Sequence, residues 1–63
     1  MSANAELSSV ATTLDELLAR VGTIADRLVG PEQEAVTSEL LEVERALGTA
    51  SRRLRRLLDS NPP

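Results

Sequence analysis

Leu28-Val29-Gly30-Pro31-Glu32 is the stretch that decides the fold, because it interrupts two long heptad patterns near the middle of the 63-residue chain. Glycine readily adopts the left-handed conformation that closes a helix, and proline fits the first turn of the next one. Acidic residues follow Pro31, where the dipole of a second helix is positive. The stretch therefore predicts a single hairpin over 1–63, with a helix over about 4–29, a turn over 30–33, a second helix over about 32–59 and a short tail over 60–63.

Before the turn, large apolar residues recur in alternating steps of three and four, which is the heptad spacing of a helix packed along one side. They are Leu7, Val10, Leu14, Leu17, Val21, Ile24 and Leu28. Ala11, Leu18 and Ala25 lie beside this row and make the apolar stripe wider than a two-stranded coiled coil uses. Because the row already includes Leu7, we expect the helix to begin early, capped by Ser2 or Asn4.

After the turn, apolar residues again recur in steps of four and three. They are Val36, Leu40, Val43, Leu47, Ala50, Leu54 and Leu57. A turn this short makes the two helices antiparallel neighbours. Pairing residues whose numbers add to 64 places an apolar residue against an apolar residue in every layer. A sum of 57 would match charges better, but it would leave Leu54 and Leu57 beyond the opposing leucines, so burial favours 64.

A chain of this size is marginally stable without help from disulfides, a metal or an oligomer. The sequence has no Cys and no His, which excludes disulfides and Cys/His zinc sites. Leu18, Leu41 and Leu58 lie beside or outside the predicted seam, and two helices alone do not cover them. The sequence therefore predicts an all-α, coiled-coil-like antiparallel hairpin that dimerises into a four-helix bundle.

The residue inventory argues against an enzyme. Without His, Cys or Lys, the hydroxyl groups have no base to activate them, and no glycine-rich phosphate loop is present. Glu39 and Glu42 share the spacing of half a carboxylate metal site, but di-iron bundles of that type also need His. The sequence has no aromatic residue to build a stacking platform or a ligand pocket. We therefore predict no catalytic residue, no cofactor, no metal and no small-molecule substrate.

The basic cluster Arg52, Arg53, Arg55 and Arg56 allows a sharper hypothesis, because guanidinium groups at a helix end can contact phosphates. A formal net charge of −3, with ten acids against seven bases, argues against nucleic acid as a partner. The acidic first half of the first helix also lies beside this cluster in the predicted hairpin. We therefore expect dipole complementation and salt bridges, with the four arginines as an interaction surface together with Leu18, Leu41 and Leu58.

No apolar run is long enough to span a membrane, and the first residues lack the basic start and apolar run of a signal peptide, so we expect a cytoplasmic protein. All seven bases are Arg, which with the Ala, Leu, Val and Glu bias indicates a GC-rich genome. The chain resembles small uncharacterised helical-hairpin proteins of actinobacteria. The resemblance lies in Leu14-Asp15-Glu16-Leu17-Leu18 and in Leu40-Leu41-Glu42-Val43-Glu44-Arg45-Ala46-Leu47 through Arg52-Arg53-Leu54.

These observations predict a non-enzymatic helical interaction module that binds itself as a homodimer or another helical protein as the small subunit of a larger complex. Two alternatives stay open. One is a small regulator that contacts nucleic acid through the Arg52–Arg56 helix end. The other is an acidic antitoxin-like or inhibitory partner that folds fully only on binding.

Overall fold

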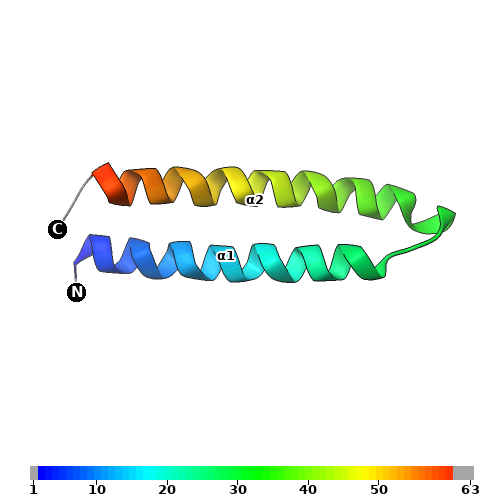
Figure 1. Ribbon diagram of the computed structural model, residues 1–63, viewed down its shortest axis with the longest axis horizontal. Helices are drawn as coiled ribbons and strands as arrows, with labels where there is room; N and C mark the ends of the chain where they lie inside the picture. The colour runs from blue at the N-terminus through cyan, green and yellow to red at the C-terminus, as the bar shows by residue number, and fades with distance from the viewer. Residues whose placement is uncertain (1, 61–63) are drawn as a thin grey trace.

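The computed structural model describes residues 2–60 and contains two long helices, α1 (Ala3–Arg27) and α2 (Glu34–Ser60). A short 3₁₀ helix, η1 (Pro31–Gln33), precedes α2. The helices lie side by side and run in opposite directions, so both ends of the described chain lie at the same end of the molecule (Figure 1). The hairpin is long and thin, 49 × 16 × 11 Å. The predicted all-α class and the helical hairpin are confirmed.

Of the two capping residues expected for the first helix, Ser2 and Asn4, the structure uses the earlier one. Ser2 is the N-cap, and its Oγ accepts a hydrogen bond from the backbone N–H of Ala5 at 3.1 Å. This bond satisfies one of the donors that the first turn of a helix leaves free. The expected tail at 60–63 lies mostly outside the described residues, and Ser60 is the last residue of α2.

The turn is longer than the sequence predicted, because α1 ends at Arg27 and not near 29. Leu28 is already extended, with φ −88° and ψ 96°, and Gly30 has a φ of 104°, which L-amino acids with side chains avoid. A residue that precedes proline is also disfavoured in the helical conformation. From α2, the Thr37 hydroxyl donates to the backbone carbonyl of Leu28 at 3.4 Å, so the second helix helps to satisfy the end of the first.

The register is close to the expected one. Asp15 contacts Ser51, while ideal Cβ atoms built at Gly48 and Gly22 would touch Leu18 and Glu44 respectively. The residue numbers in each of these pairs (15 and 51, 18 and 48, 22 and 44) add to 66. The observed sum therefore differs by two residues from the expected sum of 64, and the alternative sum of 57 is wrong.

The predicted seam, however, is wrong on one side of each helix. The helices meet through a row on α1 that consists of Leu7, Ala11, Leu14, Leu18, Val21 and Ala25, and Leu28 continues this row just after α1 ends. The facing row on α2 consists of Thr37, Leu40, Glu44, Leu47, Ser51, Leu54 and Leu58. Both rows are half-buried or buried. The residues assigned to the other half of the seam, Val10, Leu17, Ile24, Val36, Val43, Ala50 and Leu57, are exposed.

Relative to the predicted seam, each helix is rotated about its axis, and small side chains explain this rotation. Among residues 2–60 the buried positions are Ala11, Ala25 and Ser51, and no large side chain is fully buried. Small residues at a helix–helix contact allow the two backbones to approach closely, which brings many atoms into van der Waals range. The hairpin therefore packs through its alanines and a serine, and several of its larger aliphatic side chains stay outside.

Candidate interaction surface

Large aliphatic side chains that face away from the partner helix form the main feature of the surface. We call them the aliphatic face, and they are Val10, Leu17 and Ile24 on α1 with Val36, Val43 and Leu57 on α2. Their exposed fractions lie between 42% and 51%. Ala50 continues the row on α2 and is also exposed.

The aliphatic residues of the two helices lie on the same side of the hairpin. At roughly 100° per residue, Leu17 and Asp15 lie on opposite flanks of the buried row of α1. Val43 and Arg55 likewise lie on opposite flanks of the buried row of α2. Because Asp15 contacts Arg55, those two flanks face one side of the molecule. The aliphatic flanks of both helices therefore share the other side.

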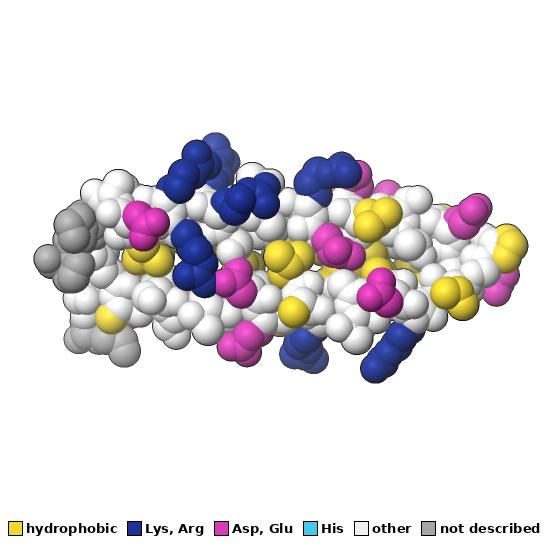
Figure 2. All heavy atoms as spheres, in the orientation of Figure 1, with side chains coloured by type: hydrophobic (Ala, Val, Ile, Leu, Met, Phe, Trp, Pro, Cys, Tyr) yellow, Lys and Arg dark blue, Asp and Glu magenta, His cyan; other side chains and the backbone are white. Residues whose placement is uncertain are grey.

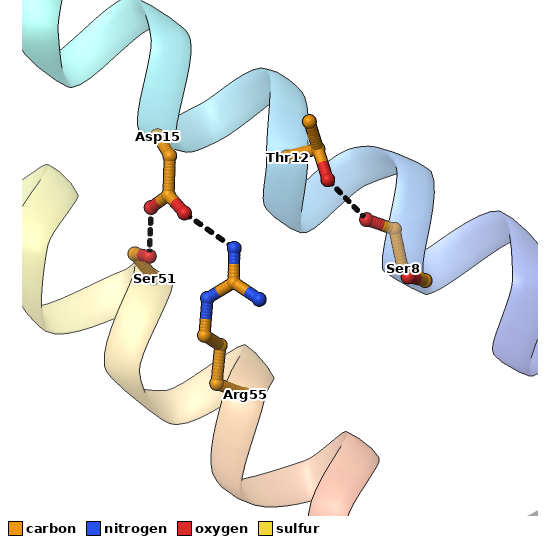
Figure 3. A network of polar contacts seen from close by, with 5 residues as sticks. All are labelled: Ser8, Thr12, Asp15, Ser51 and Arg55. Atoms are coloured by element: carbon orange, nitrogen blue, oxygen red, sulfur yellow. Dashed lines mark hydrogen bonds and ion pairs between the residues drawn. The ribbon is translucent and has the colours of Figure 1, made fainter.

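The polar side carries the one ion pair that joins the two helices within residues 2–60. Asp15 on α1 points across to α2, where the Ser51 hydroxyl donates to its Oδ1 at 2.5 Å and the Arg55 guanidinium donates to its Oδ2 (Figure 3). Both hydrogen bonds favour the charged carboxylate, and they hold the pKa of Asp15 below its usual 3.8, with Ser51 as the largest cause and Arg55 next.

This cluster is suited to holding the helices in place and poorly suited to acid–base chemistry. A carboxylate whose pKa is lowered by hydrogen bonds from Ser51 and Arg55 is a weak proton acceptor. Ser51 is only 6% exposed, so its hydroxyl is not open to a substrate. In contrast, Asp15 and Arg55 are about half exposed, and their ion pair selects the pairing of α1 with α2 more than it adds stability.

The four arginines near the end of α2 are exposed, and they differ in their contacts. Arg55 turns toward α1 to reach Asp15, and Arg52 bends back to donate to the Thr49 hydroxyl at 3.3 Å. Within residues 2–60, the side chains of Arg53 and Arg56 make no hydrogen bond or ion pair. Figure 2 shows one broad face of the hairpin, where charged side chains of both signs are spread over both helices and arginines gather over the C-terminal half of α2.

The three leucines that were expected to lie outside the seam are split by the structure. Leu41 is 51% exposed and lies on the flank that carries Arg55. Leu18 and Leu58 instead belong to the half-buried rows between the helices, so their assignment as uncovered residues is wrong. The reason is the rotation described above, which turns these leucines inward and turns Val10, Leu17 and Ile24 outward.

Sequence reasoning missed Ser51 and the specific role of Asp15. The acidic half of α1 was expected beside the arginine-rich half of α2, and the Asp15–Arg55 pair agrees with that orientation. Ser51 could not be singled out, because the predicted seam passed through Ala50. A signal was present in the width of the α1 stripe, since the row of Ala11, Leu18 and Ala25 offered a second possible contact surface.

No known protein family, curated protein or solved structure matches this chain. The resemblance to actinobacterial hairpin proteins and the cytoplasmic location therefore stay predictions. Over residues 2–60, no three acidic side chains gather closely enough to hold a metal ion. In the same range, neither helix combines the length and the apolar character that a membrane-crossing helix needs.

Proposed function

We propose that this chain is a non-enzymatic helical interaction module that self-associates through its aliphatic face into a four-helix bundle. The observation that carries the proposal is the absence of a large, fully buried side chain anywhere in residues 2–60. A chain of about 60 residues normally needs a dense core or an external support to stay folded. The single hairpin buries small residues at its centre, and a second layer of helices would supply the missing core.

The position of the aliphatic face supports the same proposal. In a four-helix bundle each helix contacts two neighbours, so its apolar stripe points between them and not straight at either one. On α1 the stripe includes the exposed row of Leu17 and the half-buried row of Leu14. On α2 it includes the exposed row of Val43 and the half-buried row of Leu47. Both stripes are thus displaced toward the same side, as a second pair of helices on that side requires.

The alternatives draw less support from the contacts. For a regulator that grips phosphates, the arginines at the end of α2 should be available together. Arg55 is instead engaged by Asp15, and Arg52 is hydrogen-bonded to Thr49. A partner that folds only on binding would be expected to bury its apolar residues against that partner, and the aliphatic face would serve there too. Self-association needs no second component, so it is the first hypothesis to test.

The proposal is tested by introducing a charge into the aliphatic face. At micromolar concentration, light scattering coupled to size exclusion should give the native chain twice its 6.8 kDa mass. Ile24→Glu should shift the mass to that of the single chain, because a carboxylate within an apolar interface loses its hydration.

Leu41→Glu is the matched control. Leu41 is exposed to nearly the same extent as Ile24, 51% against 48%, but it lies on the polar side. This variant should keep the doubled mass. A native chain that elutes as a fully helical monomer would contradict the proposal.

A further inference from the structure

The charged residues that border the aliphatic face carry information on how a second copy would sit. Each lies four residues before or three residues after an aliphatic-face residue, on its outer side: Glu6, Arg20 and Arg27 on α1, and Glu39 and Arg53 on α2. All five are exposed. In the part of the chain that the structure describes, none of them forms an ion pair. We call these five residues the rim.

The signs of the rim charges are divided along the hairpin. Near the turn, the rim is basic on α1, with Arg20 and Arg27, and acidic on α2, with Glu39. Near the chain ends the signs are reversed, with Glu6 on α1 and Arg53 on α2. A surface divided in this way is complementary to a copy of itself whose α2 lies on this α1, provided that both turns lie at the same end.

Resting on the self-association proposed above, we propose that a second copy of this chain covers the aliphatic face with both turns at the same end, so that α1 of each copy packs on α2 of the other. Within one hairpin, the observed contacts place a residue of α1 and a residue of α2 at the same height along the long axis when their numbers add to 66. Arg27 then lies level with Glu39 of the partner subunit, and the two numbers add to 66. Arg27 of each copy can then form an ion pair with Glu39 of the partner subunit, so the dimer would contain this ion pair twice.

The aliphatic layers fit the same arrangement. Val10 lies opposite Leu57 of the partner subunit, Leu17 opposite Ala50 of the partner subunit, and Ile24 opposite Val43 of the partner subunit. The numbers in each pair add to 67, one residue from the observed height relation, which corresponds to roughly 1.5 Å along a helix. A two-fold dimer keeps the observed relation at both interfaces, so all three pairs stay within about one residue of level, a distance that the side chains can span.

A dimer with its turns at opposite ends is the competing arrangement. It would place α1 on α1 and α2 on α2, with Leu17 and Ala50 each near the same residue of the partner. Val36 and Glu39, in the first turns of α2, would then lie beyond Leu57, the last large aliphatic residue of the face. Because Glu39 has no ion pair in the hairpin, this arrangement leaves it without the oppositely charged residue, Arg27 of the partner subunit, that the first arrangement gives it.

Cysteine cross-linking distinguishes the two arrangements, since the native chain contains no cysteine. Leu17→Cys and Ala50→Cys are prepared separately, mixed at a concentration where dimers form, and oxidised. The expected product is a disulfide-linked dimer that contains one chain of each variant, while each variant alone stays largely unlinked. Within one hairpin the two positions lie on different helices and separate chains carry the thiols, so an intrachain bond does not interfere.

The other results have separate meanings. Efficient linkage of Leu17→Cys to itself and of Ala50→Cys to itself would overturn the same-end arrangement. Doubled mass without any of these links would also overturn it, and self-association would still stand. Monomeric mass of the native chain would instead contradict the proposed function.

Charge reversal gives an independent readout that does not rely on disulfides. Arg27→Glu should raise the dimer dissociation constant by roughly 2- to 30-fold, the range for two exposed ion pairs. Adding Glu39→Arg should bring it back toward the native value, because the pair is restored with its signs exchanged. Failure of the second change to restore affinity would contradict the proposed contact, since a dimer with opposite ends pairs Arg27 with Glu6 instead.

Discussion

At the scale of single residues, Asp15 shows how a polar group can reinforce the register of two helices. Its two carboxylate oxygens receive donors from residues one helical turn apart on α2, Ser51 and Arg55. A shift of α2 by one heptad would remove both donors together. The lowered pKa of Asp15 reflects this pairing, because both donors stabilise the charged form.

The Asp15 cluster makes stability depend on pH in an acidic range. A carboxyl group whose pKa is lower in the folded chain stabilises the fold fully above its unfolded pKa, near 3.8, and loses that contribution as pH falls through the folded value. Asp15→Asn should therefore unfold at a lower temperature than the native chain at pH 7. The difference should shrink at pH 2, because lowering the pH below 3.8 favours protonation of the native Asp15 and weakens both contacts.

Circular dichroism melts of both chains at the two pH values test this expectation. Glu16→Gln serves as the control, because Glu16 is an exposed acid next to Asp15 and makes no hydrogen bond or ion pair within residues 2–60. Its melting temperature should stay close to the native one at pH 7. An equal loss in both variants would mean that net charge, and not the contact with Ser51 and Arg55, is responsible.

At the scale of the elements, the sequence predicted the helices and their directions well. The alternating steps of apolar residues, the cap at Ser2 and the break at Gly30-Pro31 all depend on local chemistry, and each is found in the structure. The face along which the helices meet was harder to predict from the sequence. Periodicity defines an apolar stripe, but on α1 the stripe is three rows wide, and only two rows can face one neighbour. The burial of Ala11 and Ala25 shows which rows face α2.

The glycines inside the two helices differ from Gly30 in what a side chain would meet. A Cβ at Gly48 would lie 3.4 Å from the flexible end of Arg52 and 4.0 Å from Leu18, and a Cβ at Gly22 would lie 3.8 Å from Glu44. These are separations that a small adjustment can accommodate. We therefore expect Gly48→Ala to raise the free energy of unfolding by about 0.5–1 kcal/mol through better helix propensity.

Gly30→Ala is the contrasting variant for the same measurement. The φ of Gly30 is 104°, and an added Cβ would lie 3.0 Å from a carboxylate oxygen of Glu32. This change should lower the free energy of unfolding by about 1 kcal/mol or more. Chemical denaturation of the two variants and the native chain gives all three values. Destabilisation by Gly48→Ala would mean that the helices approach one another more closely at this point than their contacts indicate.

At the scale of the whole molecule, a single hairpin has two unequal sides. One side carries the Asp15–Arg55 ion pair and exposed charges, and the other carries six large aliphatic side chains. Sequence analysis placed all six inside the hairpin, because it assumed that the strongest apolar rows face the nearest helix. In the structure the nearest helix takes the rows with the small residues. The large residues are consequently available for a contact that the isolated chain does not contain.

If that contact is a second copy, the stability of the fold must depend on protein concentration. A folded dimer that dissociates on unfolding gains about 1.4 kcal/mol per mole of dimer for each tenfold rise in concentration. With the usual unfolding entropy per residue, summed over two chains of 63 residues, this corresponds to roughly 5 °C in the unfolding midpoint. Thermal melts over a hundredfold range should therefore show a rising midpoint for the native chain. Ile24→Glu, which interrupts the aliphatic face, should give a lower midpoint that changes little with concentration. A native midpoint that stays constant over this range would contradict dimerisation, because unfolding of a monomer does not depend on its concentration.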